Sequence, residues 1–151
     1  MQENFRHLIE GFCKFCGLDD PGRILDGGAI IVNDVTFSLI HSEKVNPDLV
    51  FLYCDFGDVP VGRQAEAYRM LLEANLFLYT GNGPTFTISG ESNRVIFVDQ
   101  YRLGQNQTPE ELHTRLVAMA AKAVAWRADH FLGNGPQNRA RSASSRLPGA
   151  R

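Results

Sequence analysis

The first hydrophobic pattern in the chain has helical spacing and covers residues 4–18. Its apolar positions are Phe5, Leu8, Ile9, Phe12, Phe15 and Cys16. The polar residues Arg6, Glu10 and Lys14 fall between them, so the pattern predicts an amphipathic helix with one broad apolar face. Turn-forming residues at 17–22 are expected to end this helix.

A stretch rich in β-branched and aromatic residues follows, and it predicts short strands. The predicted strands are residues 24–25, 29–32, 35–40 and 49–54. The turn signals between them are residues 26–28, 33–34 and 46–48. Strands joined by such short links are expected to pair as an antiparallel meander. Within residues 35–40, Val35, Phe37 and Leu39 share one face of the strand and the more polar residues share the other.

Helical spacing returns at residues 63–79, where apolar side chains line one side of the predicted helix. A glycine-rich turn follows at residues 81–84. Two more strands are predicted at residues 85–89 and 94–101, and the four residues between them are typical of a hairpin link.

The last element is predicted to be a long helix that begins at Thr108. Pro109 suits the first helical position, and Thr108 with Glu111 forms the capping-box pattern at a helix start. The apolar stripe of this helix contains Leu112, Leu116, Met119, Ala123 and Trp126. The Gly-Asn-Gly-Pro sequence at residues 133–136 is expected to end it.

The predicted elements follow the order α-β-β-β-α-β-β-α. This order indicates an α+β fold, with a twisted antiparallel sheet and helices packed mainly on one face. The 151 residues fit one domain, which we expect to cover residues 1–132. Residues 133–151 contain four arginines and no acid among Ser, Ala, Gly and Pro. They are therefore predicted to be a basic, disordered tail.

Charge and composition narrow the function of this domain. Without the tail, residues 1–132 hold 11 basic and 17 acidic residues, a net charge of −6. Nucleic acid is an unsuitable partner for such an acidic domain. The sequence has no apolar run of about 18–20 residues, which a membrane-spanning helix needs, and no secretory signal is recognisable. Three cysteines are too few for a disulfide scaffold. These features predict a cytoplasmic protein that neither binds nucleic acid nor inserts into a membrane.

The strongest candidate for chemistry is the C-x-x-C pair Cys13 and Cys16. Redox dithiols place the first cysteine at a helix N-terminus, where the helix dipole lowers its pKa. Here the pair lies near the end of the predicted helix, where the dipole opposes a thiolate. A zinc site would need two further ligands, for example Cys54 and a histidine, and no second closely spaced ligand pair occurs.

Other catalytic patterns are weak. The glycine-rich residues 81–85 precede a strand and lack the Gly-Lys-Ser/Thr ending of a phosphate loop. The acidic pairs at 19–20 and 110–111 have local turn and helix roles, and a Ser-His-Asp triad stays open because it is spatial. We therefore predict no enzymatic activity, metal or cofactor, with a thiol-dependent enzyme as the alternative. The phenylalanine-rich first helix and the two-sided apolar strands instead predict a groove for a protein partner.

A further pattern lies in residues 61–77, Val-Gly-Arg-Gln-Ala-Glu-Ala-Tyr-Arg-Met-Leu-Leu-Glu-Ala-Asn-Leu-Phe. Its leucine pair and Ala-Asn-Leu precede the glycine-rich turn and a strand. The second strand ends in Gln-Tyr-Arg-Leu at 100–103, a Thr-Pro-Glu-Glu-Leu helix start follows at 108–112, and Trp126 lies near the end. With the element order, these motifs resemble the class I type III secretion chaperones, the Tir-chaperone (CesT-like) family, over residues 3–132.

The resemblance implies a bacterial, cytoplasmic homodimer that uses no ATP. Such a protein would bind the N-terminal segment of one or a few secreted effectors in extended form and keep it competent for secretion, with the secretion ATPase as a further partner. The implied dimer interface is Tyr68, Leu71, Leu72, Asn75, Leu76, Phe86 and Ile88. The implied effector-binding residues are Phe5, Leu8, Phe12, Ile31, Phe37 and Leu39. A regulatory adaptor that sequesters a protein partner, such as a transcription factor, would use the same surface and stays open.

Overall fold

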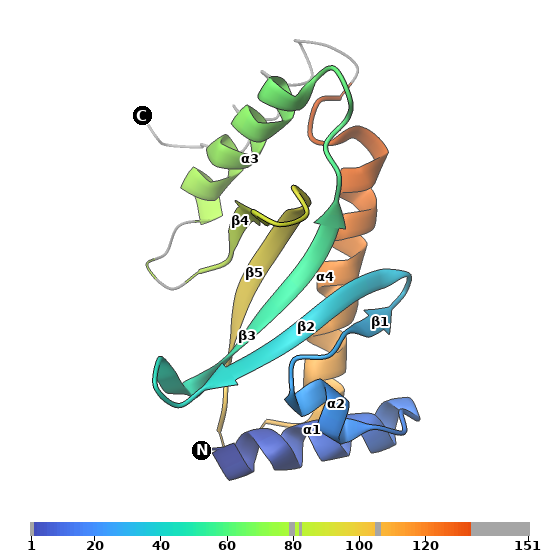
Figure 1. The fold of residues 1–151 in the computed structure, drawn as a ribbon, viewed down its shortest axis with the longest axis vertical. Coiled ribbons are helices and arrows are strands. Elements are labelled where there is room, and N and C mark those ends of the chain that lie inside the picture. The colour runs from blue at the N-terminus through green and yellow to red at the C-terminus, as the bar shows by residue number, and fades with distance from the viewer. Residues whose placement is uncertain (1, 79–80, 82, 105–106, 134–151) are drawn as a thin grey trace.

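The fold is described by a computed structural model, which covers residues 2–78, 81, 83–104 and 107–133. Its elements are α1 (Gln2–Cys16), α2 (Pro21–Leu25), β1 (Ile30–Val32), β2 (Val35–Ser42), β3 (Asn46–Gly57), α3 (Gln64–Leu78), β4 (Thr85–Ile88), β5 (Val95–Arg102) and α4 (Pro109–Asp129). The α+β class is confirmed (Figure 1). The predicted tail lies outside the described residues, except for Gly133.

The strands form one antiparallel sheet in the order β1-β2-β3-β5-β4. Asn33 and Asp34 have φ values of 49° and 65°. This conformation makes the tight two-residue turn that joins β1 to β2, as their sequence predicts. The long helix α4 crosses one face of the sheet and contacts β1, β2 and β3, and α1 packs against α4. Figure 1 shows no described helix over the centre of the opposite face.

The core lies between α4 and the inner face of the sheet. Val35, Phe37 and Leu39 are fully buried there, so the predicted facing of β2 is confirmed. Trp126 is also fully buried, and its ring centroid lies 5.8 Å from that of Phe56. Close-packed aromatic and aliphatic side chains of this kind supply most of the favourable free energy of folding.

Hydrogen bonds between neighbouring residues determine where α4 begins and where it ends. Thr108 Oγ1 accepts a hydrogen bond from the Glu111 N–H at 3.1 Å, and the Glu111 carboxylate accepts from the Thr108 N–H at 3.3 Å, so the capping box is confirmed. The predicted end at residues 133–136 is wrong. The helix ends earlier because His130 adopts a left-handed conformation and donates its N–H back to the Trp126 carbonyl.

Two other sequence predictions need correction. Residues 24–25 are helical rather than a strand. Asp20 accepts a hydrogen bond from the Arg23 N–H at 3.1 Å, and Pro21 occupies the first helical position. This cap starts a short helix despite the β-branched Ile24. Residues 46–48 begin β3 instead of forming a turn, and the turn lies at residues 43–45.

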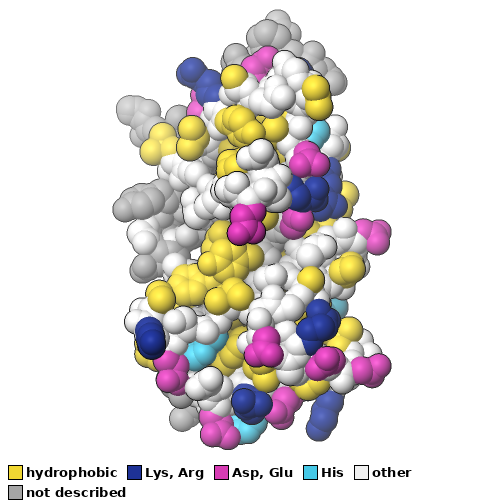
Figure 2. All heavy atoms as spheres, in the orientation of Figure 1, with side chains coloured by type: hydrophobic (Ala, Val, Ile, Leu, Met, Phe, Trp, Pro, Cys, Tyr) yellow, Lys and Arg dark blue, Asp and Glu magenta, His cyan; other side chains and the backbone are white. Residues whose placement is uncertain are grey.

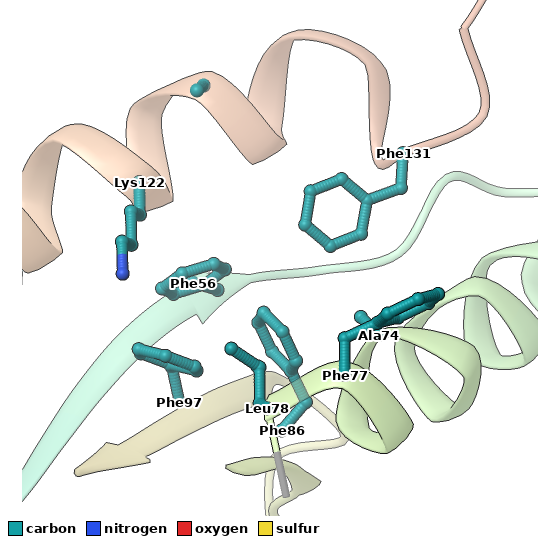
Figure 3. A pocket seen from close by; sticks show the side chains of 9 residues that line it. Phe56, Ala74, Phe77, Leu78, Phe86, Phe97, Lys122 and Phe131 are labelled. Carbon is teal, nitrogen blue, oxygen red and sulfur yellow. The ribbon is translucent and has the colours of Figure 1, made fainter. Parts of the chain in front are cut away.

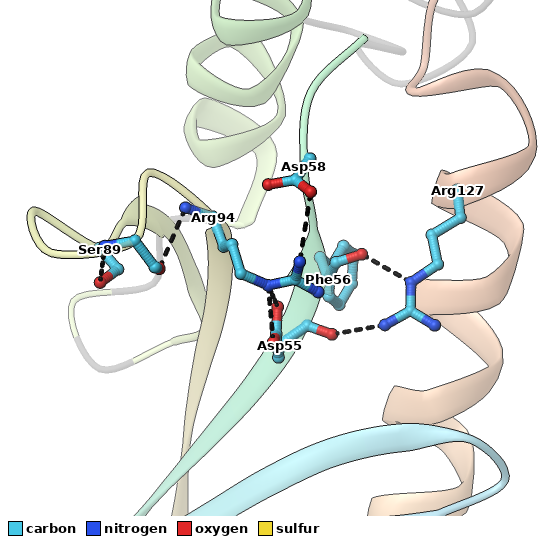
Figure 4. Close-up of polar contacts among 7 residues, drawn as sticks. Asp55, Phe56, Asp58, Ser89, Arg94 and Arg127 are labelled. Carbon is cyan, nitrogen blue, oxygen red and sulfur yellow. Dashed lines mark hydrogen bonds and ion pairs between the residues drawn. The ribbon is translucent and has the colours of Figure 1, made fainter.

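Two arginines hold the end of β3 (Figure 4). Arg127 of α4 donates to the carbonyls of Phe56, at 2.7 Å, and Asp55, at 2.9 Å. Arg94 pairs with the Asp55 carboxylate at 2.9 Å. The register of β3 against β5 shifts between Asp55 and Gly57, where Gly57 has a φ of 114°. The arginines therefore bond to a bulged strand end and connect α4 and β5 to it.

Candidate protein-binding site

The sheet has two edge strands, β1 and β4. In an antiparallel ladder, every second residue of an edge strand directs its N–H and C=O away from the neighbouring strand. Val32 and Val35 flank the two-residue turn as a hydrogen-bonded pair, so Ile31 of β1 is the residue that points outward. In β4 the outward residues are Phe86 and Ile88, because Ser89 bonds toward Arg94 across the hairpin.

A hollow of about 320 Å³ with a mixed polar and apolar surface adjoins β1. It is lined by Phe12, Phe15, Cys16, Leu18, Ile30, Ile31, Val32, Asn33 and His113. Three of the apolar side chains in this lining are exposed: Phe15 by 49%, Leu18 by 37% and Ile31 by 71%. The Phe15 ring meets His113 edge-on at 5.5 Å, which fixes the wall that α1 and α4 share. An exposed strand edge and a hollow bordered by exposed apolar side chains are therefore adjacent here.

One polar contact covers part of this edge. Arg23 Nη1 donates to the Ala29 carbonyl at 2.7 Å, and the Arg23 side chain is exposed. Ala29 is the next outward residue of the edge after Ile31, by the same alternation. The Arg23 contact therefore leaves the Ile31 peptide groups as the accessible pair on β1.

Helix α3 lies beside β4 and has two different faces. Leu71 and Ala74 are buried against the core, whereas Leu72 and Leu76 are exposed by 70% and 69%. Leu72 and Leu76 are one turn apart, so they form a continuous apolar stripe on the outward side of the helix. Two large exposed leucines on one helix face are typical of a surface that another chain covers.

A second cavity, which is apolar and has a volume of about 340 Å³, lies between α3, α4 and strands β3, β4 and β5 (Figure 3). It is lined by Phe56, Ala74, Phe77, Leu78, Phe86, Phe97, Lys122, Ala125 and Phe131. The Lys122 ammonium lies 5.7 Å from the Phe97 ring centroid, a position that suits a cation–π contact. Among the described residues that line this cavity, Phe86 is the outward residue of an edge strand, and its peptide groups are bonded to Asn75 as described below.

The sheet face opposite α4 is also partly apolar. Figure 2 shows hydrophobic side chains gathered over the middle of the molecule on this side, with charged side chains around them. Ile40 and Tyr53 of β2 and β3 are each 37% exposed. They border an open depression together with Gly27, Ser38, Thr87, Ser89 and Ile96.

The cysteines are poorly suited to redox chemistry. Burial raises the pKa of the Cys13 and Cys16 thiols, and it raises the pKa of Cys54 to about 12. A reactive cysteine needs the opposite shift, since the thiolate is the nucleophile. Among the described residues, no three His, Cys, Asp or Glu side chains gather closely enough to hold a metal ion. In the same part of the chain, no helix has the length and apolar character needed to cross a membrane.

The structure separates the predicted effector-binding residues into two groups. Phe5, Leu8, Phe12, Phe37 and Leu39 are all less than 10% exposed and belong to the core. They pack against α4 and the sheet, and Phe12 also borders the hollow beside β1. Their part in effector binding stays a prediction. Ile31 is the member of the set that lies on the surface. Sequence reasoning did not select Phe15 and Leu18, whose position near the end of the amphipathic helix was the available signal.

The predicted dimer residues are also divided. Leu72, Leu76 and Ile88 are exposed, Leu71 and Phe86 are buried, and Tyr68 is half-buried against the core. The Asn75 side chain bonds to Phe86 within the same chain. A seam on this side of the molecule would therefore use the outward stripe of α3 and the end of β4.

The fold of this domain is also found in a chain of each of two solved complexes. One is the crystal structure of the ExsC–ExsE complex, 15% identical, which covers 85% of this chain and 94% of that chain with a TM-score of 0.60. The other is the structure of the HopA1–SchA chaperone–effector complex, 13% identical, which covers 84% of this chain and 95% of that chain with a TM-score of 0.61. At these identities the likeness concerns the fold alone.

The sequence itself matches the Tir chaperone protein (CesT) family over residues 7–127. The chain therefore belongs to this family, and the resemblance in its motifs is confirmed. No curated protein matches the chain.

Proposed function

We propose that this protein is a type III secretion chaperone that binds an extended N-terminal segment of a secreted effector in the bacterial cytoplasm and keeps it competent for secretion. The observation that carries the proposal is the accessible edge of β1 beside a hollow bordered by the exposed Phe15 and Leu18 side chains, in a member of the Tir chaperone family. The complex of HopA1 with SchA, whose fold this chain shares, supports an effector as the partner.

The geometry accounts for binding of an extended chain. An effector strand laid along β1 would exchange backbone hydrogen bonds with the outward N–H and C=O of Ile31. Its residues on either side of that pair would turn their side chains toward the hollow, because side chains alternate along a strand. Phe15 and Leu18 would then contact those side chains. Several modest contacts of this kind suit a partner that must later be released.

We also propose that two copies of the chain associate through the outward stripe of α3. Leu72 and Leu76 supply the apolar centre of this seam, and Ile88 at the end of β4, 42% exposed, extends it. The effector hollow and this stripe lie at different ends of the strand order, so a dimer would keep both β1 edges accessible. The secretion ATPase stays a predicted partner.

Co-expression with the secreted proteins encoded beside the gene tests the proposal. The matched variants are Phe15→Glu and Val124→Glu, because both residues are on helices and are 49% and 52% exposed. We expect the wild type to co-purify in a stable complex with the N-terminal segment of one effector. Phe15→Glu should lose most of that complex, since it places a charge in the hollow, and Val124→Glu should retain it.

Other outcomes would contradict the proposal. If no secreted protein is retained, or if the retained segment is a folded domain, the chain is not a chaperone of this kind. If the retained protein is a transcription factor that is never secreted, the adaptor alternative is correct. If both variants bind equally well, the hollow beside β1 is not the effector site.

A further inference from the structure

The Asn75 side chain forms two hydrogen bonds with one residue of the edge strand β4. Its Oδ1 accepts from the Phe86 N–H at 2.7 Å, and its Nδ2 donates to the Phe86 carbonyl at 3.1 Å. Both groups are partly buried. Asn75 therefore satisfies both outward peptide groups of Phe86 at once.

A carboxamide is the side-chain group that can do this. It carries one acceptor oxygen and an NH₂ donor in a plane, as a peptide unit does. A carboxylate would accept from the N–H but could not donate to the carbonyl, and an aliphatic side chain could do neither. Asn75 thus occupies the position that a residue of a sixth strand would take.

The bonded position is the middle of a short edge. Strand β4 has four residues, and its outward residues are Phe86 and Ile88. With Phe86 occupied, Ile88 is the remaining outward residue of β4, and a strand added along β4 could pair with the Phe86 peptide groups only by displacing the partly buried Asn75 side chain. Asn75 is also held in place, because its helix neighbour Ala74 is buried in the core.

We propose that Asn75 closes the β4 edge against strand addition, so that each subunit accepts an extended segment at β1 only. Asn75 is then a specificity-determining residue, and it prevents the chaperone from pairing edge to edge with other chains through β4. The part of this proposal that concerns effector segments rests on the proposed function, whereas the closure of the edge does not.

Hydrogen exchange measured by NMR on the full chain tests the closure directly. In Asn75→Ala the protection factor of the Phe86 amide should fall about tenfold, as expected when a hydrogen bond of about 1–1.5 kcal/mol is lost. The Thr87 amide, which points toward β5, is the internal reference and should change by less than about twofold. Asn46→Ala is the control, since Asn46 also accepts from a backbone N–H, that of Asp48 at 2.9 Å, and should leave Phe86 unchanged.

A second variant covers the case in which Asn75→Ala fails to fold. Asn75→Asp keeps the shape of the side chain and replaces the amide by a titratable carboxyl. When protonated it can donate to the Phe86 carbonyl, so the protection factor of Phe86 should approach that of the wild type at low pH. At higher pH the carboxylate can still accept from the Phe86 N–H, but it repels the Phe86 carbonyl oxygen 3.1 Å away in the wild type, so the side chain should be displaced and protection should fall. Protection of Phe86 that does not vary with pH, relative to Thr87, would overturn the closure.

Titration with the effector segment identified by co-purification completes the test. The wild type should saturate at one segment per subunit, whereas Asn75→Ala should bind a second segment or associate beyond the proposed dimer through β4. If the wild type binds no segment, the proposed function fails although the exchange result can stand. If exchange at Phe86 and Thr87 changes equally, or the stoichiometry of Asn75→Ala stays at one without association beyond the proposed dimer, the proposal for Asn75 fails although effector binding can stand.

Discussion

The two edges of the sheet are capped by very different side chains. On β1, Arg23 makes one hydrogen bond to the Ala29 carbonyl and is exposed. On β4, Asn75 makes two hydrogen bonds to Phe86 from a helix packed against the core. An exposed arginine can exchange its bond for water at little cost, whereas a partly buried amide cannot without leaving peptide groups unsatisfied. Access to an edge therefore depends on how firmly its cap is held.

The apolar side chains beside the two edges also differ in exposure: those beside β1 are exposed, and those beside β4 are buried. Beside β1 the exposed side chains of Phe15 and Leu18 border an open hollow. Beside β4 the Phe86 ring is buried among Phe56 and Phe97, at centroid distances of 5.2 and 4.6 Å. Outward peptide groups alternate along both edge strands in the same way. The β1 edge is suited to binding because the apolar side chains beside it are exposed, whereas the β4 edge is closed because its neighbouring apolar side chains belong to the core.

The largest effect is expected at the α3 stripe next to the closed edge. Leu72→Asp places a carboxylate in the proposed apolar seam, so dimer affinity should fall by at least about 100-fold. The subunit should still fold, because residue 72 is 70% exposed in a single chain. Light scattering after gel filtration measures the mass, with Val61→Asp, 94% exposed, as the control. A dimer that survives Leu72→Asp would place the seam elsewhere.

Proline substitution compares the two edges directly. Ile31→Pro and Ile88→Pro each remove an outward N–H without removing a hydrogen bond of the sheet. We expect Ile31→Pro to weaken effector binding by about 10–100-fold, since it loses a backbone bond and an apolar contact. Ile88→Pro should change the affinity by less than about twofold. Calorimetry with the purified effector segment gives both values, and equal losses would show that the edges are not distinct.

Thiol alkylation distinguishes the β1 edge from the centre of the sheet. Cys16 lines the hollow and Cys54 is fully buried in β3. Because burial raises both pKa values, alkylation should be slow at pH 7–8 and accelerate as the pH rises past 9. Bound effector segment should slow the alkylation of Cys16 about five- to tenfold and leave Cys54 unchanged. Fast reaction of Cys13 or Cys16 near neutral pH would instead favour the thiol-enzyme alternative.

The smallest effect is expected from the cap on β1. Arg23→Gln shortens the side chain that reaches the Ala29 carbonyl, so an effector strand no longer competes with it. We expect affinity for the effector segment to rise about two- to fivefold. The same titration on Arg23→Lys, which keeps the charge, is the control. A fall in affinity would mean that Arg23 contributes to effector binding instead of restricting it.

Local sequence signals predicted much of this fold. The start of α4 is determined by the Thr108–Glu111 capping box, and the turn between β1 and β2 is determined by Asn33 and Asp34. Each signal lies within a few neighbouring residues of the sequence. The sequence does not predict burial where distant segments determine the packing. Phe12 and Phe37 have the spacing of an apolar face, but the spacing does not reveal that α4 and the sheet cover that face. The bonds from Asn75 to Phe86 join residues 11 positions apart through the packing of α3, which no local pattern specifies.

The two-residue turn after β1 has a consequence for the sequences of effectors. The turn on one side and the bonded Ala29 carbonyl on the other leave Ile31 as one accessible position between them. An incoming strand therefore has a single reading frame, in which every second side chain enters the hollow. Effector segments held by this protein should carry their apolar residues at alternate positions around one fixed point, while the residues between them are free to vary.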